Sequence, residues 1–322
     1  MKEPIFLKPI YKDYIWGGTR LKEEYNKTES NKEVIAETWE ISTNKNGKSL
    51  IKNNDEYNYN NLDEIYKNKE IREDIFGSKC KEIEEFPILI KFIDANKHLS
   101  VQVHPDDNYA EKYENSSGKT EMWYVLDCKK DSKLVCGMKD NIKQNDIQDI
   151  VKNNKVKESV NYVNIKKGDI IYIPSGTIHA ILEGALICEV QQNCDLTYRV
   201  YDWDRVDKNG NKRELHIDKA IDVINVNSEY FIKNIDNKLN LNACTEIIST
   251  PYFKIEMINV NNSIELESNK ETFYAMNVLE GNGRLKTYNN EYIIEKGDSF
   301  IIPAKLGKFN IEGELKIINS YI

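Results

Sequence analysis

Two segments of this chain repeat one pattern of glycine, aspartate and proline. Residues 166–179 read KKGDIIYIPSGTIH, and residues 295–308 read EKGDSFIIPAKLGK. Each has Gly-Asp, four residues, a proline and four more residues, and then ends at His179 in the first copy and Lys308 in the second. Upstream, WYVLDC (123–128) parallels MNVLEG (276–281). A repeated β-unit predicts two related β-barrels, an active one that has the histidine and a degenerate one that lacks it.

The patterns between these landmarks predict a mainly β chain of two domains. A length of 322 residues suits about two domains. Helical spacing of apolar residues predicts helices at about 54–85 and at 140–160, the second inserted within the first repeat copy. Apolar runs bounded by turn residues predict strands elsewhere, and after about residue 236 the chain is almost wholly short strands. We therefore predict one domain over 1–238, which carries the helices, and a compact β domain over 239–322.

Charge and hydropathy exclude several classes of protein. The net charge is −8, whereas a general nucleic-acid binder carries a basic face. No apolar run approaches the roughly 18 residues that span a bilayer, and charges and prolines interrupt the first residues where a signal sequence would need an apolar core. We expect a cytoplasmic protein with neither nucleic-acid nor membrane partners. An anionic substrate would then need a local cluster of Lys and Arg.

The stretch SVQVHPDD (100–107) places an amide and an imidazole on one face of a predicted strand. Residues two apart on a strand lie roughly 6.5 Å apart and point the same way. Gln102 and His104 therefore face one side, and Val101 and Val103 face the other, towards the core. The polar pair needs hydrogen-bond partners or a metal ion.

A metal is the stronger interpretation once the other candidate ligands are included. The chain has four histidines, so a purely imidazole cluster is excluded and oxygen ligands are needed. His104, Glu121 and His179 each lie at an end of a predicted strand, and Gln102 adds an amide oxygen. Catalytic zinc takes about three protein ligands and keeps one position open. The two remaining histidines, His98 and His216, are interpreted as ordinary structural residues.

Several motifs together resemble a known family. FPILIKFIDANKHLSVQVHPDD, GKTEMWYVL, GDIIYIPSGTIHAI and EVQQNCDLTYRVYDWDR are similar to segments of the type I mannose-6-phosphate isomerases, in their short bacterial form. WGGTRL (16–21) and ETWEIS (37–42) match the family's landmarks near the N-terminus. The resemblance covers essentially the whole chain.

This resemblance implies a zinc-dependent enzyme that interconverts mannose 6-phosphate and fructose 6-phosphate. The implied fold is two cupin barrels, a catalytic one with a helical insert and a metal-free one. Gln102, His104, Glu121 and His179 fall on the family's ligands for one zinc ion. Arg199 falls on its active-site arginine, and Lys119 on the lysine beside the metal-binding glutamate.

The reaction accounts for these residue types. Isomerisation through an enediol builds negative charge on a sugar oxygen, which a metal ion and a fixed arginine can both stabilise. Read locally, Arg199 could instead be a surface partner of Asp202 or Asp204, and the family match reverses that preference. Lys119 is expected to oppose the substrate's charge with Arg199, and Arg205 is a weaker candidate for the phosphate.

Other questions stay open at this point. Glu40, Glu189 and a metal-bound water are all candidates for the group that shuttles the proton. A two-His, one-carboxylate set also suits an Fe(II) oxygenase, and a non-catalytic sugar-phosphate binder or a related aldose substrate is a further alternative. The oligomeric state is not readable from the sequence.

Overall fold

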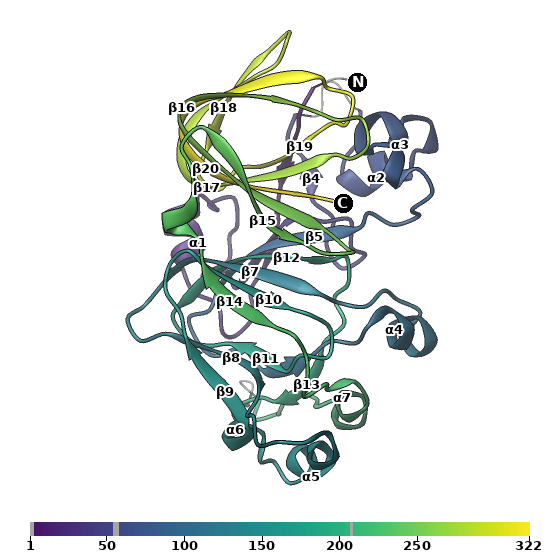
Figure 1. The fold of residues 1–322 in the computed structure, drawn as a ribbon, viewed down its shortest axis with the longest axis vertical. Helices are drawn as coiled ribbons and strands as arrows, with labels where there is room; N and C mark the ends of the chain where they lie inside the picture. The colour runs from purple at the N-terminus through teal and green to yellow at the C-terminus, as the bar shows by residue number, and fades with distance from the viewer. Residues whose placement is uncertain (1–2, 54–57, 207–208) are drawn as a thin grey trace.

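The structure is a computed structural model that describes residues 3–53, 58–206 and 209–322. It contains two β-barrels stacked along the long axis of the molecule, with most of the helices at their sides (Figure 1). The mainly β prediction is confirmed. Within the described residues, no helix is both long and apolar enough to cross a membrane.

The first barrel is formed by two antiparallel sheets whose inner faces meet. The larger sheet has the order β14 (Phe231–Asn234), β10 (Asp169–Ile173), β7 (Glu121–Cys128), β12 (Ala185–Gln192), β5 (Ile88–Asp94), β3 (Glu37–Ile41) and β2 (Ile10–Lys12). The smaller sheet has the order β13 (Tyr198–Tyr201), β6 (Val101–Val103), β11 (His179–Ile181), β8 (Lys133–Met138) and β9 (Val160–Asn164). One apolar cluster joins the two inner faces and includes Trp123 and Ile187 from the larger sheet with Leu134 and Ile181 from the smaller one.

The central strands of the larger sheet are buried on both faces. Along β5, Lys91 and Ile93 face the barrel interior, whereas Ile90 and Phe92 pack in the core shared with the second barrel. This explains why the segment ILIKFID is almost wholly apolar, since a strand covered on both sides has no solvent face.

The second barrel takes strands from both ends of the described chain. Its sheet runs β15 (Ala243–Ser249), β16 (Lys254–Glu267), β20 (Lys308–Tyr321), β17 (Tyr274–Lys286), β19 (Ser299–Ile302), β1 (Ile5–Lys8) and β4 (Leu50–Ile51), and β18 (Glu291–Glu295) pairs with β17. Ile5 of β1 lies opposite Ile301 of β19. The domain boundary at residue 238 therefore stays a prediction. It does not separate the strands of the two barrels, because β1 and β4 precede it and belong to the second barrel.

The two repeat copies make the same turn. In each, the backbone N–H three residues before the aspartate donates to its carboxylate at 2.9 Å, from Lys166 to Asp169 and from Glu295 to Asp298. The glycines of both turns have positive φ, 82° at Gly168 and 96° at Gly297, which side chains with a Cβ disfavour. The first copy then leads to His179, and the second to the exposed Lys308, which pairs with Glu265.

Within the described residues, helical elements lie in both predicted segments, and α-helices also lie in three others. The segment 54–85 contains α2 (Leu62–Lys67), α3 (Lys69–Phe76) and the 3₁₀ turn η2 (Ser78–Cys80), although residues 54–57 fall outside the described part. The segment 140–160 contains η3 (Gln144–Asp146), α5 (Ile147–Lys152) and α6 (Val156–Ser159). The unpredicted helical elements are α1 (Arg20–Tyr25), α4 (Asp107–Glu114) and α7 (Ile217–Val223), with a 3₁₀ turn η4 (Asp236–Lys238).

Candidate metal centre

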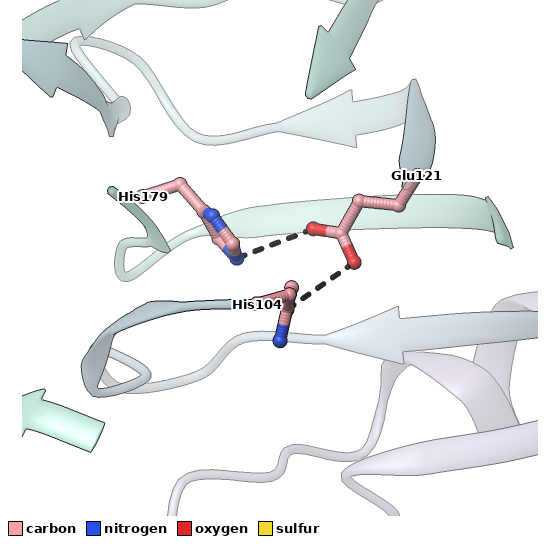
Figure 2. Close-up of side chains that lie close together, drawn as sticks. All are labelled: His104, Glu121 and His179. Carbon is pink, nitrogen blue, oxygen red and sulfur yellow. Dashed lines mark ion pairs between the residues drawn. The ribbon is translucent and has the colours of Figure 1, made fainter. Parts of the chain in front are cut away.

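Three of the predicted ligands converge inside the first barrel. Glu121 begins β7, His179 begins β11, and His104 directly follows β6. The Nε2 atom of His179 lies 3.2 Å from Glu121 Oε1, and that of His104 lies 3.6 Å from Glu121 Oε2. Figure 2 shows the three side chains pointing toward one another from separate strands, and one donor atom from each lies within 4.8 Å of the others. Two sheets and three strand ends thus build one compact group.

The protonation of this group favours a bound cation. His179 Nδ1 lies 2.8 Å from the carbonyl oxygen of Thr177, so it donates there and leaves Nε2 as an acceptor aimed at Glu121. Two acceptors at this distance need a shared proton or a cation between them. Burial lowers the pKa of His179 to about 4, and burial with the charge of Lys119 holds the pKa of His104 well below its usual range. Both imidazoles are therefore neutral at pH 7, the form in which histidine binds metals.

Glu121 is the carboxylate of the group and is fully buried. Burial raises its pKa, because a charge without solvent is destabilised. Its Oε2 pairs with Lys119, and within the described chain its Oε1 has no hydrogen-bond donor. Two neutral imidazoles and one carboxylate are a donor set that fits a divalent zinc ion.

Gln102 is placed beside the same group. It lies opposite His179 in the pairing of β6 with β11, so both side chains face the barrel interior. Its amide Nε2 lies 3.3 Å from His179 Nε2. A half-turn of the amide exchanges nitrogen for oxygen, which is the atom that a metal would require. Val101 and Val103 pack on the opposite face, as predicted.

Lys119 lies directly against the metal-ligand group. Its Nζ is 2.7 Å from Glu121 Oε2 and 3.1 Å from His104 Nε2, and its side chain is buried. It also lines the cavity that opens above the group. Lys119 is therefore a fixed positive charge at the floor of that cavity.

Glu189 lies on the cavity wall, on β12. Its carboxylate accepts from Trp123 Nε1 at 3.0 Å and pairs with Lys91 at 3.0 Å. Burial opposes its ionisation, but Lys91 and Lys119 outweigh burial and lower the pKa of Glu189. Lys91 was not singled out from the sequence. Its signal was a lysine at the centre of an apolar strand, since a buried ammonium needs a carboxylate partner.

Arg199 faces the same cavity from β13. Its Nη1 donates to the backbone oxygen of Glu214 at 2.8 Å, and its half-buried guanidinium makes no ion pair within the described residues. The alternative of a surface pair with Asp202 or Asp204 is wrong, since Asp202 pairs with Arg205 and Arg213, and Asp204 pairs with Lys212.

Two of the weaker candidates lie away from this cavity. Arg205 does not line it, because its guanidinium is held by Asp202 and by the backbone oxygen of His98. Glu40 points to the opposite face of β3, where it pairs with Lys27 at 2.7 Å and accepts from Ser299 at 2.6 Å. Neither Arg205 nor Glu40 lines this cavity, so its geometry does not support either candidate for the role considered from the sequence.

The remaining histidines have ordinary roles. His98 Nδ1 accepts the backbone N–H of Glu183 at 2.9 Å, and His216 Nδ1 accepts that of Arg199 at 3.1 Å. Neither belongs to the metal-ligand group. Both imidazoles make structural hydrogen bonds to the backbone, in line with their interpretation from the sequence.

The cavity above the group has a volume of about 500 Å³ and carries a local excess of positive charge. Its cationic lining residues are Lys12, Lys91, Lys119, Arg199 and Arg213. Its carboxylate lining residues are Glu37, Glu189 and Asp195. The predicted local cluster of basic residues is present in a chain whose net charge is −8, and such a cavity attracts a small anion.

Comparison with known proteins places this geometry in context. Residues 5–132 match the family model for the catalytic domain of type I phosphomannose isomerase, and residues 243–322 match that for the cupin domain of mannose-6-phosphate isomerase. The chain is 38% identical over 326 residues to the mannose-6-phosphate isomerase ManA of Bacillus subtilis, covering 99% of each chain. It is 37% identical over 325 residues to the probable mannose-6-phosphate isomerase GmuF of the same organism, covering all of both.

A solved structure agrees with these matches. The crystal structure of the mannose 6-phosphate isomerase from Bacillus subtilis superposes with a TM-score of 0.87 at 35% identity, covering 99% of both chains. The predicted cupin architecture is confirmed, and the likeness extends over both barrels.

Proposed function

Because this chain belongs to the type I phosphomannose isomerase family and is an enzyme of that class, we propose that it interconverts mannose 6-phosphate and fructose 6-phosphate with one zinc ion. Its ligands are His104, Glu121 and His179, with the amide oxygen of Gln102 as the fourth. The observation that carries the proposal is the convergence of three buried ligand atoms, one each from His104, Glu121 and His179, within 4.8 Å of one another.

A zinc ion held by these residues would supply a Lewis acid that stabilises negative charge on the oxygens of the open-chain sugar. The chain's own cations would stabilise the same negative charge, which develops on the sugar oxygens as the enediolate forms. Lys119 is fixed at the cavity floor by Glu121, and Arg199 is fixed by the backbone of Glu214. Preorganised cations stabilise the enediolate because they do not have to reorient as its charge develops.

The proton between C1 and C2 needs an acceptor on the cavity. Of the two carboxylates considered from the sequence, Glu189 lines the cavity and Glu40 does not. The neighbouring lysines keep Glu189 ionised, so it carries no proton of its own, although they also lower its basicity. We infer that Glu189 is the side chain in position for this transfer.

The proposal is tested by following fructose 6-phosphate formation from mannose 6-phosphate in a coupled assay, with and without a chelator. We expect turnover in the untreated protein, loss of turnover after chelation, and recovery on addition of zinc. Elemental analysis should find one zinc per chain. Absence of turnover in the zinc-loaded protein would leave a sugar-phosphate binder, and iron with oxygen consumption would indicate the oxygenase alternative.

Arg199→Ala should lower kcat by about a hundredfold to a thousandfold, the usual effect of removing one preorganised donor of about 2.7–4 kcal/mol. Zinc content should be unchanged, because Arg199 is not among the proposed ligands. Steady-state kinetics with elemental analysis measures both quantities.

Arg284→Ala is the matched control for this variant. It removes an exposed arginine from β17 of the second barrel, where Arg284 pairs with Glu291 at 2.6 Å. Its kinetics should equal those of the unmodified protein. Near-normal turnover in Arg199→Ala with zinc retained would remove Arg199 from the mechanism.

A further inference from the structure

The segment that follows β13 is bonded back onto Arg199. The backbone N–H of His216 donates to the carbonyl oxygen of Arg199 at 2.8 Å, and the N–H of Arg199 donates to His216 Nδ1 at 3.1 Å. The side chain of Arg199 donates to the backbone oxygen of Glu214 at 2.8 Å. These bonds fix the backbone next to Arg213, whose side chain reaches the same cavity as Arg199.

Asp202 orients the guanidinium of Arg213. Arg213 Nε donates to Asp202 Oδ2 at 2.8 Å, and its Nη2 contacts Asp202 Oδ1, which makes a two-pronged contact. Asp202 is buried, and Arg205 also contacts it. The single carboxylate of Asp202 thus pairs with both Arg205 and Arg213. Because Arg199 has no carboxylate partner among the described residues, Arg199 and Arg213 together leave an excess of positive charge at the cavity.

Arg213 keeps donors available on the side away from Asp202. A guanidinium carries five N–H groups in a planar fork, and Asp202 engages the edge formed by Nε and Nη2. No hydrogen bond of Nη1 occurs among the described residues. With 31% of its side chain exposed, Arg213 lies at the solvent side of the cavity, whereas Lys119, which lines the same cavity 2.7 Å from the metal-ligand group, is buried.

We propose that Arg213 binds the phosphate group of the substrate, with Arg199 beside it and with Asp202 as its positioning residue. This inference rests on the proposed function, which places the reacting C1 and C2 end of an open-chain sugar at the metal-ligand group. The phosphate at the other end of the sugar then lies towards the solvent side of the cavity. A guanidinium suits it because its fork can donate two parallel hydrogen bonds to a phosphate.

The other cations at the cavity are less suited to this role. Lys91 and Lys119 lie against Glu189 and Glu121. Lys12 donates to the backbone oxygen of Asn46 at 2.7 Å and lies 4.4 Å from the centre of the Trp39 ring. Lys12 is the rival with an exposed ammonium, and the experiment below includes it.

The test measures binding of inorganic phosphate by calorimetry, and kinetics with mannose 6-phosphate, in Arg213→Gln. Loss of a hydrogen bond to a charged group should weaken phosphate binding and raise KM by about tenfold to a hundredfold. The value of kcat should stay within about twofold, because the reacting end of the sugar is untouched. Arg213→Lys should recover part of the phosphate affinity, since it restores the charge without the planar fork.

Lys212→Gln is the matched control. It makes the same change of charge one residue away, at an exposed lysine that pairs with Asp204 at 3.0 Å and does not line the cavity. Its phosphate affinity and KM should match those of the unmodified protein. Unchanged phosphate affinity in Arg213→Gln, or a loss in Lys12→Gln alone, would overturn the inference.

The calorimetric arm separates this inference from the proposed function. Phosphate binding that depends on Arg213 in a protein without isomerase activity would retain the anion site and reject the proposed reaction. Isomerase activity with a KM that is insensitive to Arg213→Gln would retain the reaction and reject the site. Equal melting temperature and metal content in the variants show that the fold is intact.

Discussion

Replacing His179 with alanine is expected to remove the bound zinc and to lower turnover by about three orders of magnitude. The size follows from a metal contribution of several kcal/mol to transition-state stabilisation, at a tenfold rate change for each 1.36 kcal/mol. His179 is central to the group, because it lies 3.2 Å from Glu121 and directly opposite Gln102. Elemental analysis and coupled-assay kinetics on the purified variant measure the two effects, and His104→Ala should behave alike.

His98→Ala is the matched control for this pair. His98 makes an ordinary hydrogen bond to the backbone of Glu183 and is not in the metal-ligand group. Its zinc content should equal that of the unmodified protein. Tight stoichiometric zinc in either His104→Ala or His179→Ala would count against the ligand set.

Replacing Glu40 with alanine is expected to lower the free energy of unfolding by about 3–5 kcal/mol, the usual effect of leaving one member of a buried ion pair unpaired. Glu40 is fully buried and Lys27 nearly so. The carboxylate also accepts from Thr38 and Ser299, each at 2.6 Å. Denaturant unfolding monitored by tryptophan fluorescence measures the change.

Two further variants identify the cause. Lys27→Met combined with Glu40→Leu removes both charges and should recover most of the lost stability, because neither charge is left buried alone. Glu265→Ala breaks the exposed pair with Lys308 and should leave the unfolding midpoint unchanged. A loss in Glu265→Ala as large as that in Glu40→Ala would show that burial is not the source of the effect.

The sequence predicted those parts of the fold that depend on local pattern. The repeated Gly-Asp turn predicted both barrels because the same backbone hydrogen bond requires the same two residues in each copy. It did not predict that β1 and β4 join the second barrel. Such pairing depends on residues far apart in the chain, and alternation within a strand carries no information about its partner. Helix α4 was not predicted, although Asp106 caps it by accepting from the N–H of Tyr109.

The site was predicted where one short motif determines which way the side chains point from their strand. It was missed where that orientation depends on how the strand lies in the sheet. Gln102 and His104 lie beside Glu121 and His179 inside one barrel, and the ligand role of the four residues stays a prediction. Glu40 was a plausible carboxylate by residue type, but it lies on the face of β3 opposite the cavity. Arg213 gave no signal in sequence, because its position depends on hydrogen bonds that fold its segment back onto β13.

Strand β1 contributes side chains to two cores, so the completion of both during synthesis depends on when its partner strand is made. It places Phe6 inside the second barrel and Ile5 and Leu7 in the core between the barrels. Its partner β19 is translated near the other end of this sequence, and at about 5–20 residues per second the wait is roughly tens of seconds. Until β19 has been made, the edge of β1 that pairs with it stays unpaired, and both cores lack the side chains of β19. The barrel that holds the metal-ligand group can therefore complete the core that it shares with the second barrel only after nearly all of this sequence has left the ribosome.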